Sequence, residues 1–301
     1  MFFRNLALFR IPNTLDFTSL DELLPVAELK PVGPLELASR GFVSPFGRGE
    51  SALSHQIGAA IWLSVGGEDR ILPAAVVNDV LAKKLAELEQ KNGRKPGGKA
   101  RRALKDEILH DLLPRAFVRP SRTDALIDLE HNFVAVDTSS KRTGENVVSE
   151  IRRAMGSFPA LPLNAEIAVR SVLTGWVAGE PLPEGLEMGE ECELREPVDG
   201  GAVVRVRDMA GMCGEITTHL EAGMQVTRLA LTLNDHVSFV LGEDLVIRKF
   251  KLLDGAVESL ENTEHDDLRA ELDARFALLA GEVRGLFAVL EPALKLSKAE
   301  G

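Results

Sequence analysis

Residues 73–113, PAAVVNDVLAKKLAELEQKNGRKPGGKARRALKDEILHDLL, predict two helices joined by a loop, a helical hairpin. In each half, apolar residues recur every three or four positions, as on one buried face of a helix. Those of the first half are Val77, Leu81, Leu85 and Leu88, and those of the second are Leu104, Ile108, Leu109, Leu112 and Leu113. The Gly-rich residues 92–98 break the first helix, and Pro114 ends the second.

The tip of this hairpin is strongly basic. Between residues 91 and 105 there is no acid and there are seven cations: Lys91, Arg94, Lys95, Lys99, Arg101, Arg102 and Lys105. Arg115, Arg119 and Arg122 continue the series. The usual interpretation of such a run is a solvated helical face. So dense a positive charge, however, also creates a local field that attracts polyanions.

The charge of the whole chain hides this polarity. Its 301 residues carry 35 Lys+Arg against 46 Asp+Glu, a net charge of −11, which by itself argues against a nucleic-acid binder. Yet the stretch from Lys83 to Arg122 holds 12 basic and 5 acidic residues, a net charge of +7, so the remainder carries −18. Because no zinc or helix-turn-helix frame accompanies the basic stretch, we expect phosphate contacts without base readout.

Outside the hairpin, the first half of the chain predicts a mixture of strands and helices. Strands are expected at residues 2–11 and 59–65, the latter followed by a turn at the two glycines 66–67. Further on, the pattern predicts a β-hairpin and two helices: strands 124–129 and 132–137, and helices 21–29 and 144–155.

The second half predicts an antiparallel meander and a long final helix. Residues 180–200 contain eight acids and are interpreted as a solvated surface. Strands are expected at 202–207, 225–233, 236–241 and 245–252. The last helix follows the apolar series that starts at Leu268, with an N-terminal cap at residues 263–266. The fold class is therefore α+β, with antiparallel sheets, a basic helical hairpin and a long C-terminal helix.

The same patterns predict three parts of the chain. Residues 1–72 and 114–160 form a central α+β domain, residues 73–113 form the hairpin inserted in it, and residues 161–301 form a C-terminal α+β domain. A composition of 45% hydrophobic and 27% charged residues is that of a globular protein. Two cysteines provide no disulfide framework, the N-terminus lacks a signal-peptide pattern, and no apolar run spans a membrane, so we expect a cytoplasmic protein.

Motifs of catalysis are weak. Residues 93–100, GRKPGGKA, match the spacing of a P-loop, but Ala100 stands where Mg²⁺ needs a hydroxyl, and the segment follows a helix rather than a strand. We interpret it as a helix–helix linker. Glu215 and His219 are interpreted as a surface pair on a short helix. We therefore expect no catalytic residues, no metal and no cofactor, and the protein is not expected to be an enzyme.

Short motifs along nearly the whole chain resemble the bacterial recombination-associated protein family RdgC. They are FRNL at 3–6, ILP at 71–73, LKDE at 104–107, LLPRAF at 112–117, GSFP at 156–159 and EIT at 215–217. The resemblance implies a ring-shaped homodimer whose basic inner surface encircles duplex DNA without sequence specificity. It further implies a nucleoid-associated role in recombination and replication, through restraint of RecA-type recombinase. It implies that Phe117 contacts the second subunit and that Arg205 and Arg207 contact DNA.

The resulting hypothesis is a non-enzymatic duplex DNA-binding dimer. Two alternatives stay open at this point. The basic hairpin could hold the substrate of a metal-dependent nuclease or another phosphoryl-transfer enzyme, or it could dock an acidic protein partner.

Overall fold

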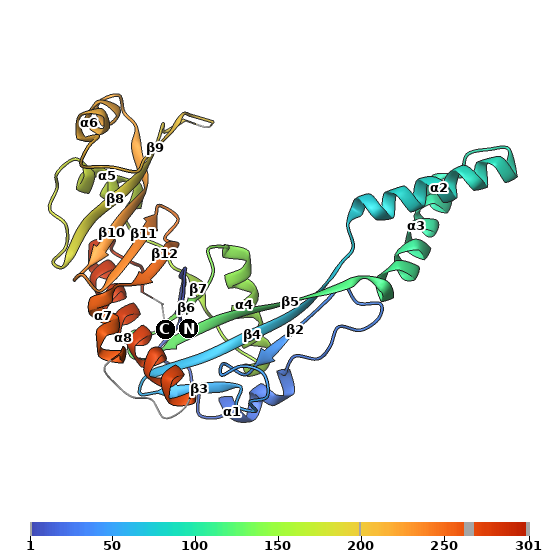
Figure 1. Cartoon of the computed structure of the whole chain (residues 1–301), viewed down its shortest axis with the longest axis horizontal. Helices are drawn as coiled ribbons and strands as arrows, with labels where there is room; N and C mark the ends of the chain where they lie inside the picture. Colours follow the sequence, from blue (N-terminus) through green and yellow to red (C-terminus); the bar gives the residue numbers. More distant parts are fainter. Residues whose placement is uncertain (1, 199, 262–267, 299–301) are drawn as a thin grey trace.

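The computed structural model describes residues 2–198, 200–261 and 268–298, and shows an elongated α+β molecule with two antiparallel sheets. The molecule is curved, with the helical hairpin at one end of the curve and the C-terminal sheet at the other (Figure 1). The expected fold class is thus confirmed for one chain. Among the described residues, no helix combines the length and the apolar content that crossing a lipid bilayer would require.

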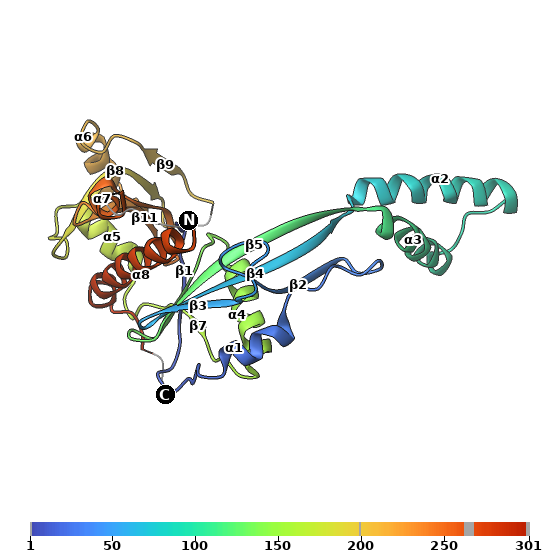
Figure 2. The same cartoon turned by 60° about the horizontal axis from the view of Figure 1, so that its bottom comes forward.

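The first sheet is built around two long strands. Its strands are β1 Ala7–Arg10, β2 Ala38–Val43, β3 Ser54–Ile57, β4 Ala60–Ile71, β5 Phe117–Asp128, β6 Phe133–Val136 and β7 Leu161–Pro162. They lie in the order β2-β4-β5-β6-β1-β7, with β3 also paired to β4. β4 and β5 pair without interruption over all twelve residues of each. β2 pairs with residues 64–69 of β4, and β6 pairs with residues 125–128 of β5. The far ends of β4 and β5 lead into the hairpin (Figure 2).

The predicted turn at glycines 66–67 is wrong, because both residues continue β4. Gly66 pairs with Arg122 of β5 and with Gly41 of β2. A Cβ atom on Gly66 would lie 2.6 Å from a methyl carbon of Val43, too close for a real contact. Glycine is therefore needed here for close packing of a strand interior rather than for a turn.

The helical hairpin is confirmed. It consists of α2 Ala74–Asn92 and α3 Gly98–Leu112. Gly93 ends α2 in the left-handed conformation, with φ of 65°, which glycine adopts without steric cost. Val77, Leu81 and Ile108 form a small buried core between the helices. We call α2, α3 and their connection the arm.

The remaining helical segments of the first half flank the first sheet. They are α1 Leu20–Leu23, the 3₁₀ segments Leu24–Ala27 and Leu113–Arg115, and α4 Lys141–Met155. The helix expected at 21–29 is thus broken, since a 3₁₀ turn with Pro25 as its second residue interrupts it.

The C-terminal sheet contains the predicted meander and two further strands. Its strands are β8 Leu186–Arg195, β9 Val203–Val206, β10 Gln225–Leu233, β11 Val237–Gly242 and β12 Ile247–Leu252, in the order β12-β11-β10-β8-β9. The helices of this half are α5 Val169–Val177, α6 Cys213–Glu221, α7 Asp254–Glu261 and α8 Leu268–Ala293. The cap predicted at residues 263–266 lies outside the described residues.

Helix α8 joins the two sheets into one hydrophobic core. Phe276 stacks on Trp62 of β4 with ring centroids 5.3 Å apart, and Phe287 stacks on Phe133 of β6 at 4.4 Å. Arg284 of α8 forms an ion pair of 2.7 Å with the fully buried Asp128. One apolar cluster therefore contains residues from both sides of residue 161, and the division into three domains stays a prediction.

Candidate nucleic-acid interface

The arm presents seven exposed cations. None of them forms an ion pair with a described residue: Lys91, Arg94, Lys95, Lys99, Arg101, Arg102 and Lys105. The ion pairs of the arm belong to other lysines, because Lys83 pairs with Asp79 at 2.8 Å and Lys84 pairs with Glu107 of α3 at 3.2 Å. The positive charge at the tip of the arm is therefore not neutralised within the described part of the chain.

The cations at the base of the arm are more varied. Arg115 is exposed in the 3₁₀ turn after α3, and no ion pair joins it to a described acid. Arg119 is 67% exposed and lies 3.7 Å from Asp69. Arg122, which the sequence placed in the same series, instead donates hydrogen bonds to Asp124, to Ser64 and to the carbonyl of Pro45. Its charge is engaged in the sheet, so we remove it from the candidate interface.

Phe117 lies at an open edge of the first sheet. β6 pairs only with residues 125–128 of β5, so the outer half of β5 has a described neighbour, β4, on one edge alone. Phe117 is 83% exposed, and its neighbours Val118 and Ile71 are also exposed. An exposed apolar patch beside an unpaired strand edge is a surface that favours protein association.

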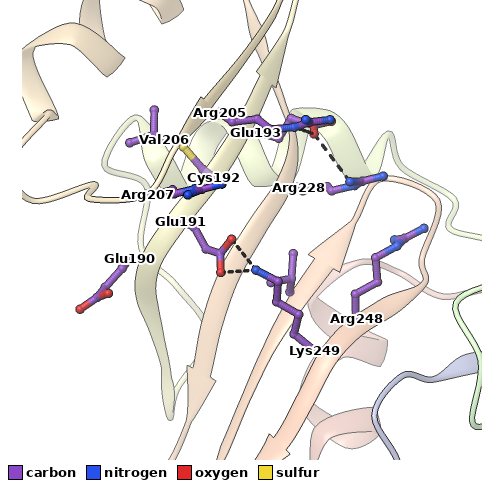
Figure 3. Close-up of a pocket in the computed structure, with 11 residues that line it drawn as sticks. Glu190, Glu191, Cys192, Glu193, Arg205, Val206, Arg207, Arg228, Arg248 and Lys249 are labelled. Atoms are coloured by element: carbon purple, nitrogen blue, oxygen red, sulfur yellow. Dashed lines mark hydrogen bonds and ion pairs between the residues drawn. The ribbon is translucent and has the colours of Figure 1, made fainter.

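A second group of cations lies in a cavity of about 500 Å³ on the C-terminal sheet (Figure 3). The cations that line the cavity are Arg205, Arg207, Arg228, Arg248 and Lys249, and the acids are Glu190, Glu191 and Glu193. Both arginines expected from the family resemblance, Arg205 and Arg207, are therefore together. We call this group the sheet cavity.

One ion pair spans the sheet cavity. Lys249 of β12 pairs with Glu191 of β8 at 2.6 Å, although β11 and β10 lie between the two strands. Neighbouring strands are about 4.8 Å apart, so in a flat sheet these two backbones would be separated by roughly 14 Å. The two side chains therefore reach across the intervening strands and bridge the cavity.

Glu193 lies in the middle of the arginines. In the register of the sheet it is directly opposite Arg228 on one side and Arg205 on the other. Its carboxylate accepts a hydrogen bond of 2.8 Å from Arg205 and lies 3.6 Å from Arg228, and its side chain is 7% exposed. Burial opposes ionisation, but hydrogen bonds from Arg205 and Thr227 and the charge of Arg228 outweigh it, so the pKa of Glu193 lies below its usual value.

The other cations of the cavity are also engaged, with one exception. Arg248 forms an ion pair with Asp244 at 2.6 Å, and Lys249 pairs with Glu191. Arg207 is exposed and forms no ion pair with a described residue. Cys192, which also lines the cavity, is buried, and burial raises the pKa of its thiol to about 11. This thiol is therefore held in its protonated, unreactive form at neutral pH.

Sequence reasoning missed Arg228, Arg248 and Lys249, and its interpretation of residues 180–200 as a solvated surface is wrong for part of them. Residues 186–195 form β8, which contributes Glu191 and Glu193 to the cavity. The local sequence around Arg228 does not indicate a binding site. Arg228 lies beside Glu193 only because β10 pairs with β8.

The weaker motifs take ordinary positions. Residues 93–97 link α2 to α3, as predicted, rather than a strand to a helix. Glu215 and His219 lie on α6, the expected short helix. In the described ranges, no three His, Cys, Asp or Glu side chains gather into a group that could hold a metal ion.

The molecule is an elongated α+β protein with a cation-lined sheet cavity and a basic arm, whose seven tip cations form no ion pair with a described residue. These features make it a candidate polyanion-binding protein. Comparison with known proteins places it more closely. A family model described as "RdgC: Putative exonuclease, RdgC" matches residues 1–297. The chain belongs to the RdgC family.

Curated relatives of this chain match it from end to end. "Recombination-associated protein RdgC" of Xanthomonas axonopodis pv. citri (strain 306) is 65% identical over 301 residues, which is 100% of both chains. The protein of the same name from Xanthomonas campestris pv. campestris (strain B100) is also 65% identical over the full length of both. That of Stenotrophomonas maltophilia (strain R551-3) is 62% identical, again over 100% of both chains.

Proposed function

We propose that this protein binds duplex DNA without sequence preference and acts in recombination. The observation that carries the proposal is a set of seven exposed cations that form no ion pair with a described residue, on an arm that extends from the body of the molecule. Cations that are not neutralised internally can replace the counterions of a phosphate backbone, and the release of those counterions favours binding. Helix faces without a base-reading frame favour contacts to phosphates, which carry no sequence information.

The protein acts as a homodimer closed into a ring around the DNA. The curved shape supports this proposal, because it leaves the basic arm and the C-terminal sheet at opposite ends of one curve (Figures 1 and 2). The sheet cavity is lined by residues of that sheet. The exposed Phe117 patch supplies an apolar surface for the second copy. A ring retains DNA by topology, so many weak phosphate contacts suffice and aromatic platforms for bases are not needed.

By occupying duplex DNA, the ring restrains RecA-type recombinase in the nucleoid. The names of the relatives, which describe recombination-associated proteins, support a role in this process. The proposed role is that of a competitor for DNA, without enzymatic turnover.

The test is to measure affinity for several duplexes of unrelated sequence, together with the mass of the protein in solution with and without DNA. We expect affinities that agree within about threefold and a dimer in both samples. A strong preference for one sequence, or a monomer that does not bind, contradicts the proposal.

Incubation of duplex DNA with the protein and Mg²⁺ or Mn²⁺ distinguishes the nuclease alternative. We expect intact DNA, and cleavage would make the protein an enzyme.

A further inference from the structure

The sheet cavity holds its own anion in contact with its arginines. The Glu193 carboxylate touches Arg205 and Arg228, and Arg195 lies 3.7 Å from it on the same strand. Thr227, which is buried, donates a further hydrogen bond of 3.1 Å to the carboxylate. A carboxylate in this position makes the same kind of charged hydrogen bonds to guanidinium groups that a phosphate oxygen would make.

The arginines beside Glu193 are nevertheless accessible. The side chain of Arg205 is 71% exposed and that of Arg228 is 44% exposed, whereas the side chain of Glu193 is 7% exposed. In Figure 3 the dashed contacts of Glu193 lead to these two guanidinium groups at the wall of the cavity. A ligand in the cavity can thus reach the exposed guanidinium groups of both arginines, and it meets Arg207, which forms no ion pair with a described residue, in the same cavity.

We propose that Glu193 is an internal competitor for phosphate, which keeps the sheet cavity at low affinity until a backbone phosphate of DNA replaces it on Arg205 and Arg228. The inference rests on the proposed function and adds a regulatory residue to it. The cavity then contributes to binding only where phosphates are already concentrated by contacts elsewhere, such as those of the arm. Because Glu193 reduces the net positive charge of the cavity, it also disfavours the capture of isolated small anions.

The decisive variant is Glu193→Gln, which removes the charge but keeps the size and a hydrogen-bond acceptor. Its matched control is Glu187→Gln on the same strand, because Glu187 is exposed and forms no ion pair with a described residue. We expect Glu193→Gln to bind duplex DNA about 3–10-fold more tightly than the wild type. The slope of log affinity against log salt should become steeper by about one, the value of one additional phosphate contact.

For Glu187→Gln we expect an affinity within about twofold of the wild type, because an exposed charge is screened by salt. Equal effects of the two substitutions, or weaker binding by Glu193→Gln, overturn the inference. The gain must also disappear when Glu193→Gln is combined with Arg205→Gln and Arg228→Gln. If it persists in that background, Glu193 does not act through these arginines.

Two further measurements keep the test decisive. If Glu193→Gln does not fold, the variant to use is Glu193→Asp, which retains the charge but moves it away from the arginines by one methylene. We expect this variant to gain affinity for duplex DNA, by less than Glu193→Gln would. No gain in affinity rejects the inference. Titration with inorganic tripolyphosphate separates the inference from the proposed function. Tighter binding of tripolyphosphate by Glu193→Gln than by Glu187→Gln supports the competitor even if duplex DNA does not bind, and equal binding overturns it.

Discussion

The arm and the sheet cavity are both rich in cations, yet they differ in how those cations are neutralised. The arm presents seven cations without an ion pair to a described residue, whereas four of the five cations in the cavity contact an acid. The difference shows that the number of basic residues does not measure the charge available to a ligand. Availability depends on which acids the fold places beside them.

The two regions differ in this way because of their folds. The arm is a hairpin of two helices that touches few other elements, so only its own acids can reach its cations, and two of these face Lys84. The cavity lies on a sheet, in which side chains from distant parts of the sequence are neighbours across paired strands. We therefore expect the arm to dominate affinity and the cavity to adjust it.

Neutralising cations of the arm should have the largest effect on duplex affinity, and it tests whether the arm dominates that affinity. The triple variant Arg101→Gln, Arg102→Gln, Lys105→Gln should lower duplex affinity about 100-fold at low salt, because each subunit loses three phosphate contacts. The control is Lys83→Gln with Lys84→Gln, whose charges are already paired, and for it we expect a loss below about threefold. Titration of a labelled duplex measures both. Equal losses per charge would show that ion pairing does not decide availability.

Phe117 contacts the second copy of the chain in our proposal, and its removal should have the next largest effect. Phe117→Ala is expected to weaken dimerisation by about 30-fold, the loss typical of an aromatic anchor in an interface. Because the side chain is 83% exposed in one chain, the unfolding temperature of the monomer should stay nearly unchanged. Sedimentation at several concentrations measures the association, and Val26→Ala, at another exposed apolar residue, is the control. A dimer of unchanged strength rejects this role for Phe117.

Within the cavity, two arginines can be compared in the same way: Arg207, which forms no ion pair with a described residue, and Arg205, which pairs with Glu193. Arg207→Gln should lower duplex affinity about fivefold, whereas Arg205→Gln should lower it by less than about twofold, since the charge of Arg205 is already neutralised by Glu193. The measurement is the same titration at constant salt. A greater loss for Arg205→Gln would mean that Glu193 positions this arginine for DNA instead of competing with DNA.

The smallest effect concerns pH. The pKa of Glu193 is lowered from 4.5 in the folded protein, so its ionised form contributes stability that is complete above about pH 4.5 and is lost as pH falls through the lower folded value. The unfolding temperature of the wild type should therefore fall more than that of Glu193→Gln between about pH 5 and pH 3. Parallel curves for the two proteins would show that Glu193 gains nothing from its arginines.

The arm could be predicted from the sequence because its information is local. Its apolar residues repeat at helical spacing, and its cations lie within fifteen consecutive residues. The sheet cavity depends on pairing between strands that are distant in the sequence. Glu193, Arg205 and Arg228 meet only because β8 lies between β9 and β10, and a register shift near Arg228 sets which residues are opposite each other.

Two of the wrong expectations, the turn at residues 66–67 and the solvated surface at residues 180–200, have the same origin. Two consecutive glycines usually indicate a turn, but Gly66 and Gly67 make room for side chains of the neighbouring strands, which the local sequence does not specify. Residues 186–195 alternate too weakly to predict a strand, and their low β-propensity is overridden by pairing with β10. The family motifs could not supply Glu193 or Arg228 either, since neither belongs to a matching segment.

The salt dependence of duplex binding tests the central claim most directly. We predict that log affinity of the wild type falls linearly with log salt, with a slope that corresponds to about 6–10 phosphate contacts and is the same for unrelated sequences. The arm variant Arg101→Gln, Arg102→Gln, Lys105→Gln should show a clearly shallower slope on each duplex. A flat response of the wild type, or an unchanged slope in the arm variant, would contradict the account.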